Sequence, residues 1–219
     1  SLFRHEGNKL YYDSDEYDCL QGIDVSHHQG KIDWNKVKDQ GYDFTIVRIG
    51  YRGYGKEGSL NADREYLNNL NGAREAGLKT GVYFFAQAIN EEEALEEADF
   101  VLMLLKDLEI DLPVVYDPES ILDDIARTDN ISGEQFTKNA RVFCDRIKEA
   151  GYEPMIYSNM LWEAFELDLT KLSDIEIWYA DYEALPQTPY HFKYWQYSNE
   201  GRVEGIRGDV DLDIMLKEK

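Results

Sequence analysis

Short apolar runs alternate with amphipathic segments along most of this chain. Runs of strand length cover residues 22–26, 44–49, 80–86, 112–116 and 154–157, and three more cover 175–182, 192–197 and 210–215. Continuous apolar runs of this length are typical of strands buried in a parallel sheet. Segments with helical spacing or a helix-start signal follow the first five runs, at 33–38, 62–76, 91–106, 132–150 and 160–165. The pattern predicts eight strands, of which only the first five are followed by helices.

Two of the predicted helices carry clear end signals. The segment 62–76 stops at Gly77, and the segment 132–150 stops at Gly151, the residue type that most often ends a helix. The latter segment also opens with Ser132 and Gln135, the spacing of a capping box.

Strand–helix units joined by short links imply a parallel sheet with right-handed crossovers. Eight such strands favour a closed α/β barrel, with an open doubly wound sheet as the alternative. No dinucleotide-binding glycine fingerprint or phosphate loop follows any strand, which weighs against the open sheet. The glycine-rich stretch 50–55 matches neither motif, and we interpret it as a flexible loop.

Size and composition fit a single domain. The chain has 219 residues, of which 43% are hydrophobic, and no linker rich in Pro, Gly or Ser divides it. Residues 1–20 are polar and rich in Tyr and Asp, so we expect a linker or a wrapping arm there and a catalytic barrel over 21–219.

The charge of the chain excludes several partners. A net charge of −21 leaves no basic patch for nucleic acid or an anionic membrane.

Cys19 and Cys144 are either a disulfide or two free thiols, and they are too few for a zinc site. His27 and His28 are adjacent, so on a strand they would point to opposite faces and could not chelate one metal ion together. We expect them to support the structure, and we predict no metal.

The run at 112–116 ends in two carboxylates, Asp117 and Glu119. Side chains two residues apart on a strand project from the same face. Two adjacent carboxyl groups do not both ionise freely, so one becomes a proton donor while the other stays charged. This arrangement suits general acid/base chemistry, and glycoside cleavage is a common use of it.

The same Asp-x-Glu spacing occurs at three other places, and strand position separates them. Catalytic groups of a parallel barrel lie at the C-terminal ends of its strands. The pairs at 107/109 and 174/176 precede strands and fall at the opposite end, while at 181/183 only the aspartate lies at a strand end. The pair at 117/119 is therefore the best candidate.

Other acids are predicted to reach the same barrel mouth. Asp24 ends the first strand, Asp181 lies on the sixth, and Asp213 on the last strand is a further candidate. Each could be structural alone, but burying several unpaired acids costs about 1–3 kcal/mol per group or more. Such a cluster is typical of an active site.

Aromatic and polar side chains near the strand ends suggest a saccharide groove, because sugar rings stack on aromatic faces while their hydroxyls bind polar groups. The candidate binding residues are Tyr83, Phe85, Tyr116, Tyr157, Tyr182, Trp195, Gln196 and Asp213. Part of this set is expected to be ordinary core packing.

The sequence resembles the glycoside hydrolase family 25 lysozymes, the muramidases of bacteria and phages. The resemblance is carried by Gly22–Gly30 with Ile32-Asp33-Trp34, and by the blocks at 44–48, 76–83, 115–119, 177–182 and 195–198. It covers about residues 21–216. It implies an irregular (β/α)5β3 barrel that cleaves the β-1,4 bond between N-acetylmuramic acid and N-acetylglucosamine in peptidoglycan, without a metal or organic cofactor.

The resemblance also implies roles for individual residues. Glu119 would be the general acid, and Asp117 would stabilise the transition state or orient the 2-acetamido group. Asp24 and Asp181 would complete the acidic floor. Direct attack by water and attack by the acetamido group both remain open. Two departures from the family pattern are Pro118 between the acids, and Asp213 where an asparagine is expected.

These observations predict a monomeric, bacterial peptidoglycan hydrolase. It would be extracellular or cell-wall associated, with a signal or anchor trimmed from this sequence. The alternatives are a non-catalytic saccharide-binding barrel and a hydrolase of another amino-sugar polymer such as chitin.

Overall fold

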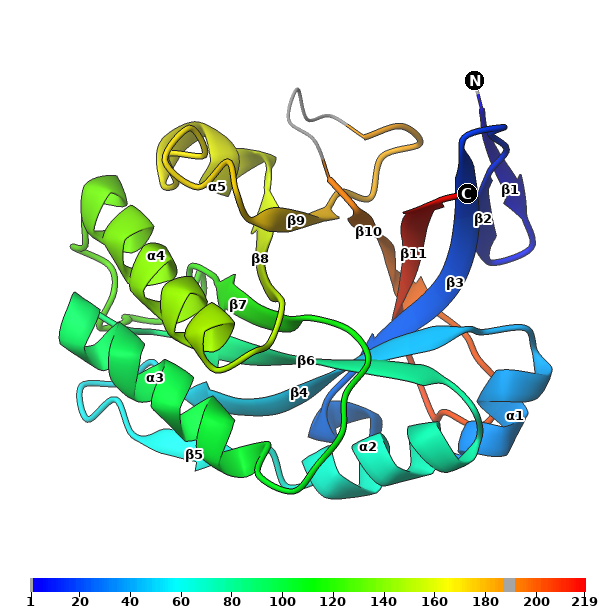
Figure 1. Cartoon of the computed structure of the whole chain (residues 1–219), viewed down its shortest axis with the longest axis horizontal. Helices are drawn as coiled ribbons and strands as arrows, with labels where there is room; N and C mark the ends of the chain where they lie inside the picture. Colours follow the sequence, from blue (N-terminus) through cyan, green and yellow to red (C-terminus); the bar gives the residue numbers. More distant parts are fainter. Residues whose placement is uncertain (1, 187–191) are drawn as a thin grey trace.

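A closed barrel of eight strands dominates the computed structural model, which describes residues 2–186 and 192–219 (Figure 1). In chain order, the barrel strands are β3 (Tyr17–Val25), β4 (Phe44–Arg52), β6 (Lys79–Ala86), β7 (Val114–Pro118), β8 (Pro154–Asn159), β9 (Glu176–Ala180), β10 (Tyr194–Gly201) and β11 (Val210–Glu218). The order around the barrel is β3-β11-β10-β9-β8-β7-β6-β4, and the pairing of β3 with β4 closes it. The predicted closed barrel is confirmed.

The strands are parallel except for the last. β11 runs antiparallel to both of its neighbours, β10 and β3. Its first residues therefore lie at the end of the barrel where the parallel strands finish. A short strand, β5 (Leu60–Ala62), pairs with the end of β4 outside the ring of eight strands.

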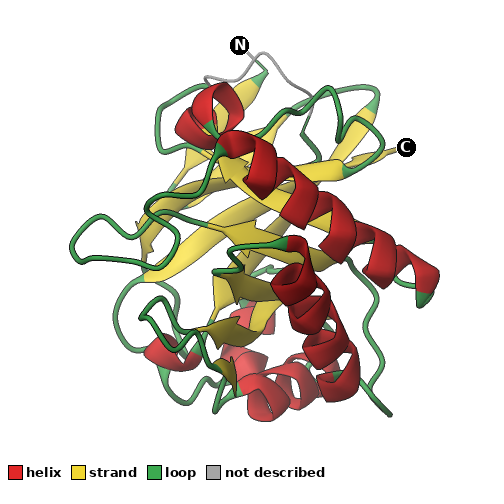
Figure 2. Ribbon diagram, turned by 90° about the vertical axis from the view of Figure 1, so that its left-hand side faces the viewer, coloured by secondary structure: helices red, strands yellow, loops and turns green. Residues whose placement is uncertain are grey.

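Helices pack against the outside of the barrel strands (Figure 2). They are α1 (Trp34–Asp39), α2 (Tyr66–Glu75), α3 (Glu91–Leu104), α4 (Gly133–Glu149) and α5 (Met160–Phe165). Each comes after one of the first five barrel strands, and none follows β9 or β10 in the described part, so the (β/α)5β3 arrangement is confirmed. The predicted ends of α4 are also observed: the Ser132 hydroxyl accepts the backbone N–H of Gln135, and Gly151 follows with a φ of 93°.

An N-terminal hairpin covers part of the side that has no helices. Its strands, β1 (Phe3–Glu6) and β2 (Lys9–Tyr12), lie beside β3 and β11 (Figure 1). Leu10 is completely buried, and its carbonyl accepts the side-chain amide of Gln21 at 2.7 Å. Phe3 packs on the edge of Trp195, with 5.1 Å between ring centroids. The apolar pattern did not predict these two strands, because they are short and mostly polar.

The hydrophobic core has two layers. Inside the barrel, Phe44, Ile46, Val115 and Trp178 belong to one cluster. Outside it, a larger cluster fills the space between the strands, the helices and the hairpin. Gly22 lies in the interior, where an added Cβ would come within 2.5 Å of the Phe44 ring, so this strand approaches its neighbour only because residue 22 has no side chain.

Residues 50–52 are not part of a flexible loop, because they belong to β4 and pair with β5. Cys19 and Cys144 are both free thiols, one half-buried and one buried. Among the described residues, no helix is both long and apolar enough to cross a membrane.

Candidate active site

The two carboxylates of the Asp-x-Glu pair contact each other at the C-terminal end of β7. Asp117 is the penultimate residue of the strand and is buried, while Glu119 lies just beyond it and is half-buried. The two carboxyl groups share a hydrogen bond. The strand pleat explains this contact, because side chains two apart project to the same side.

Three further aspartates form a buried cluster beside this pair. Asp24 lies directly opposite Asp211 in the antiparallel pairing of β3 and β11, and its carboxyl group hydrogen-bonds with those of Asp211 and Asp213. Asp213 is completely buried and accepts the indole N–H of Trp178 at 2.8 Å. Like charges directly opposite in a sheet destabilise it, so these carboxyl groups must share protons.

Burial explains the protonation of the aspartate cluster and of the neighbouring carboxylate pair. Desolvation raises the pKa of Asp24 well above its usual range, that of Asp211 to about 10 and that of Asp213 to about 7. Burial also raises the pKa of Asp117 and Glu119. Their mutual contact raises the pKa of Asp117 further and lowers that of Glu119. In the free protein, the two carboxyl groups of this pair therefore share a proton.

Gln196 joins the aspartate cluster to two tyrosine hydroxyls. Its amide nitrogen donates to Asp24 at 2.8 Å, and its amide oxygen accepts the hydroxyls of Tyr157 and Tyr182, each at 2.8 Å. Tyr182 is 52% exposed, so this network extends from the buried floor to the surface. A ligand in the mouth would meet hydroxyl and amide groups whose orientations are already fixed.

A cationic group lies on β4, the strand next to Asp24. Arg48 is two residues beyond Ile46, which pairs with Asp24 and belongs to the interior cluster, so Arg48 faces inward above Asp24. Its guanidinium donates to buried Asp63 at 2.9 Å and lies 2.6 Å from Nδ1 of His27. The positive charge of Arg48 lowers the pKa of Asp117.

His27 and His28 are placed differently from the prediction. They lie in a 3-10 turn, His27–Gln29, rather than on a strand. Their rings contact each other, with 4.2 Å between centroids, so the argument from opposite strand faces was wrong. In the part of the chain that the structure describes, no group of three or more His, Cys, Asp or Glu side chains is arranged to hold a metal ion.

The predicted saccharide-binding residues divide between the two faces of the barrel wall. Tyr83 and Tyr157 belong to the interior layer, and Phe85 pairs with Asp117 and shares its face. Tyr116 and Trp195 belong to the outer layer instead: Tyr116 packs on Phe143 of α4, and Trp195 packs on Phe3 of the hairpin. The prediction that these two line the mouth is wrong, because each is one residue from an inward side chain.

Asp181 is not part of the aspartate cluster. Its carboxylate accepts the Tyr179 hydroxyl at 3.2 Å and the backbone N–H of Glu183 at 2.9 Å. Tyr179 belongs to the outer layer. Asp181 also lines a surface pocket with Asn159 and Met160. We therefore do not assign it to the acidic floor, and Asp211 takes the place that the sequence analysis gave it.

The sequence analysis missed Asp211, although a usable signal was present. Asp211 and Asp213 have the same spacing of two residues as the catalytic candidates. Candidates were sought at the C-terminal ends of strands, but β11 runs in the opposite direction, so its first residues reach the mouth. Arg48 was missed because a single arginine on an apolar strand has no distinctive spacing.

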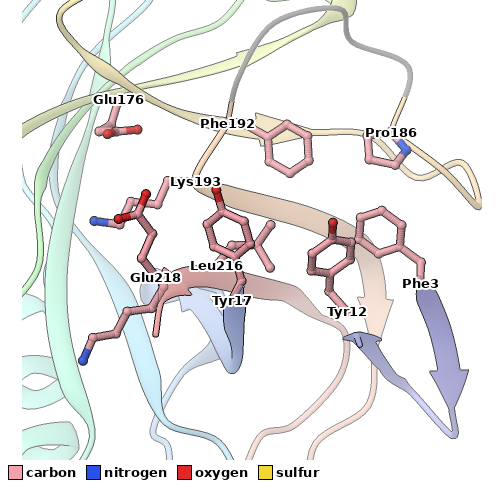
Figure 3. A pocket seen from close by; sticks show the side chains of 10 residues that line it. Phe3, Tyr12, Tyr17, Glu176, Pro186, Phe192, Lys193, Leu216 and Glu218 are labelled. Carbon is pink, nitrogen blue, oxygen red and sulfur yellow. The ribbon is translucent and has the colours of Figure 1, made fainter. Parts of the chain in front are cut away.

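A separate cavity of about 710 Å³ lies at the other end of the barrel (Figure 3). Glu176 and Tyr17 begin β9 and β3, and Glu218 ends antiparallel β11, which places the cavity where the parallel strands start. Phe3 and Tyr12 of the hairpin form one side of it. This cavity is distinct from the carboxylate site.

Comparisons with known proteins agree with this architecture. A family model described as "Glycosyl hydrolases family 25" matches residues 23–206. The "Autolytic lysozyme" of Clostridium acetobutylicum is 29% identical over 195 residues, covering 89% of this chain and 55% of that protein. "Lysozyme M1" of Streptomyces globisporus is 30% identical over 202 residues, covering 88% of this chain and 66% of that protein.

A solved structure of the modular autolysin LytC from Streptococcus pneumoniae in complex with a synthetic peptidoglycan ligand is also similar. Its TM-score is 0.78 at 26% identity, and the match covers 97% of this chain and 51% of that one. The chain thus spans about half the length of the autolytic lysozyme and of the autolysin.

Proposed function

This chain belongs to family 25 of the glycosyl hydrolases, and on that premise we propose that it hydrolyses peptidoglycan. The bond cleaved is the β-1,4 linkage between N-acetylmuramic acid and N-acetylglucosamine. The observation that carries the proposal is the contact between Asp117 and Glu119 at the mouth of the barrel, beside a fixed network of acids, hydroxyls and an amide. The lysozyme relatives and the peptidoglycan-bound autolysin support this choice of substrate.

The first step of the mechanism brings the shared proton of the pair onto Glu119. In the free protein, the two carboxyl groups share this proton, because both are buried and in contact. When the N–H of a 2-acetamido group donates to Asp117, it favours the Asp117 anion. The proton then moves to Glu119, which is more exposed and can reach the glycosidic oxygen. Substrate binding thereby converts Glu119 into the general acid that the sequence analysis expected.

The close contact of the two carboxyl groups favours a substrate-assisted route. Retaining enzymes with a carboxylate nucleophile separate their carboxyl groups by about 5 Å, and inverting enzymes by about 6.5–9.5 Å. Groups that share a hydrogen bond are closer than either. The acetamido oxygen therefore attacks C1 while the C1–O bond breaks and Glu119 protonates the leaving oxygen. Water then opens the cyclic intermediate, giving up a proton to Glu119, and the β configuration is retained.

Digestion of purified peptidoglycan tests this function. We expect new reducing ends on muramic acid. Release of reducing ends from chitin alone would support a different amino-sugar hydrolase, and binding without release would support a saccharide-binding barrel.

A matched pair of variants tests the assignment of Glu119. Glu119→Gln should lower kcat by about 100- to 10,000-fold, because general acid catalysis contributes about 10²–10⁴-fold. Glu183→Gln alters the exposed glutamate of another Asp-x-Glu pair and should leave kcat unchanged. A nearly wild-type rate for Glu119→Gln would refute the assignment.

The partner and location of the protein follow from the substrate. Peptidoglycan glycan strands lie outside the cytoplasmic membrane, so we place the protein outside the cell or at the wall. We expect it to act as a monomer and without a metal or organic cofactor, because carboxylate chemistry needs only the side chains described above.

A further inference from the structure

We propose that Gln87 is a positioning residue that holds Glu119 in its working place through a main-chain hydrogen bond. The proposal rests on the proposed function, since it concerns the residue that donates the proton. Gln87 follows β6 directly and is 1% exposed. Its side-chain amide nitrogen donates to the backbone carbonyl of Glu119 at 2.8 Å.

The neighbouring strands bring these residues together. Ala86, the last residue of β6, pairs with Pro118, the last residue of β7, so Gln87 and Glu119 both lie one position beyond their strands. Beyond Pro118 the ladder no longer fixes the chain, because the pairing of β7 with β6 ends at Pro118. The Gln87 side chain supplies a bond at the first position where β7 lacks one.

All four polar groups of Gln87 are engaged, so its orientation is determined. Its backbone N–H donates to buried Glu97 of α3 at 3.1 Å, and its carbonyl accepts Arg127 at 2.9 Å. Its amide oxygen accepts the Thr128 hydroxyl at 3.1 Å. Because Thr128 donates to the oxygen, the amide nitrogen must face Glu119. Gln87 therefore connects Glu119 both to α3 and to the loop after Glu119 that contains Arg127 and Thr128.

The loop that contains Arg127 is also bonded to α3. Arg127 forms two bonds with Glu93, at 2.6 and 2.8 Å, in addition to its bond to Gln87. Glu97 is completely buried and accepts Arg52 at 3.3 Å. Gln87 lies between these two ion pairs, so it is held from both sides and can hold Glu119 in turn. Without it, Glu119 could turn away from Asp117 toward water.

The test compares Gln87→Met with a matched control. Asn139 of α4 is also a completely buried carboxamide, and its nitrogen donates to the carbonyl of Ala88 at 3.1 Å, one residue along the same segment. Asn139→Leu removes a similar bond without touching Glu119. Both variants should lose stability, but only Gln87→Met should lower kcat, by about 10-fold, with KM changed less than about threefold.

The pH dependence separates positioning from simple destabilisation. Since burial raises the pKa of Glu119, releasing this residue toward water should lower that pKa. We expect the alkaline limb of the kcat profile to move down by at least half a pH unit in Gln87→Met and not in Asn139→Leu. Carbon-13 NMR titration of the Glu119 carboxyl should show the same shift without any substrate.

Each outcome decides the question. Failure of the wild type to cleave any glycan would refute the proposed function, and the NMR titration would still test the role of Gln87. An unchanged kcat and titration in Gln87→Met, or equal changes in Asn139→Leu, would overturn the positioning role. If Gln87→Met does not fold, Thr128→Val removes the donor that orients the amide and should give smaller shifts in the same direction.

Discussion

Asp213→Asn should stabilise the protein at alkaline pH, which is unusual for a substitution in a buried polar cluster. Asp213 is completely buried between Asp24, which shares a hydrogen bond with it, and the Trp178 indole, which donates to it at 2.8 Å. Asparagine has nearly the same shape. Its oxygen can still accept from Trp178, and its N–H groups can replace the proton shared with Asp24. The substitution therefore removes a charge and leaves the packing intact.

The size of the effect follows from the pKa. Burial raises the pKa of Asp213 from 3.8 to about 7, and each factor of ten in the dissociation constant is worth about 1.4 kcal/mol. A carboxyl group with a raised folded pKa stabilises the fold fully below about pH 4, and this contribution is lost as the pH rises to about 7. Ionising Asp213 alone would cost roughly 4 kcal/mol. Because Asp24 and Asp211 share the protons of the cluster, we expect the variant to recover about 1–3 kcal/mol at pH 8.

Thermal unfolding at two pH values measures this effect. At pH 8 the melting temperature of Asp213→Asn should exceed that of the wild type by about 2–4 °C for each kcal/mol. At pH 4.5 the two proteins should agree within about 0.5 kcal/mol, because both are then neutral at this position. Asp15→Asn, at an exposed site, controls for the change in net charge and should change neither value. Equal or lower stability of Asp213→Asn at pH 8 would refute the reasoning.

Three further predictions follow from the charges and burial described above. Arg48→Gln removes the cation that lowers the pKa of Asp117, so the acidic limb of the kcat/KM profile, which reports ionisation of Asp117, should move to higher pH; an unmoved acidic limb would show that the charge of Arg48 does not affect Asp117. Moderate salt should raise activity on whole walls, because it screens repulsion between an anionic wall and a chain of net charge −21; a flat or falling salt profile would contradict this. A thiol reagent should label half-buried Cys19 faster than buried Cys144 in the native state; equal rates, measured by peptide mass analysis, would argue against the observed burial.

The larger elements of the fold could be predicted because each has a local cause. Apolar runs of strand length and amphipathic segments gave eight strands and five helices in the right order, and the ends of α4 were signalled by Ser132 and Gly151. The carboxylates Asp117 and Glu119 were identified by strand position, which the structure reproduces. Periodicity of this kind is encoded over a few residues.

The orientation of individual side chains was harder to predict. In a strand buried on both sides, apolar residues occupy both faces, so composition does not show which face is interior. Tyr116 and Trp195 were expected in the mouth, yet strict alternation already excludes them once Asp117 and Gln196 point inward. Applying the period of two to both strands would have corrected these assignments without a structure.

The sequence by itself determined the order of strands and helices and the pair of acids at the end of β7, because each depends on neighbouring residues. Only the tertiary structure decided which other acids join them. Asp211 lies at the mouth because β11 runs antiparallel to its neighbours. Asp181 is not part of the aspartate cluster, and its carboxylate accepts hydrogen bonds from Tyr179 and Glu183. The Gln87 side chain bonds to the backbone of Glu119, which is 32 residues away in the sequence, because their strands are neighbours. Strand direction and contacts between distant segments arise from closing the barrel, so no local pattern encodes them.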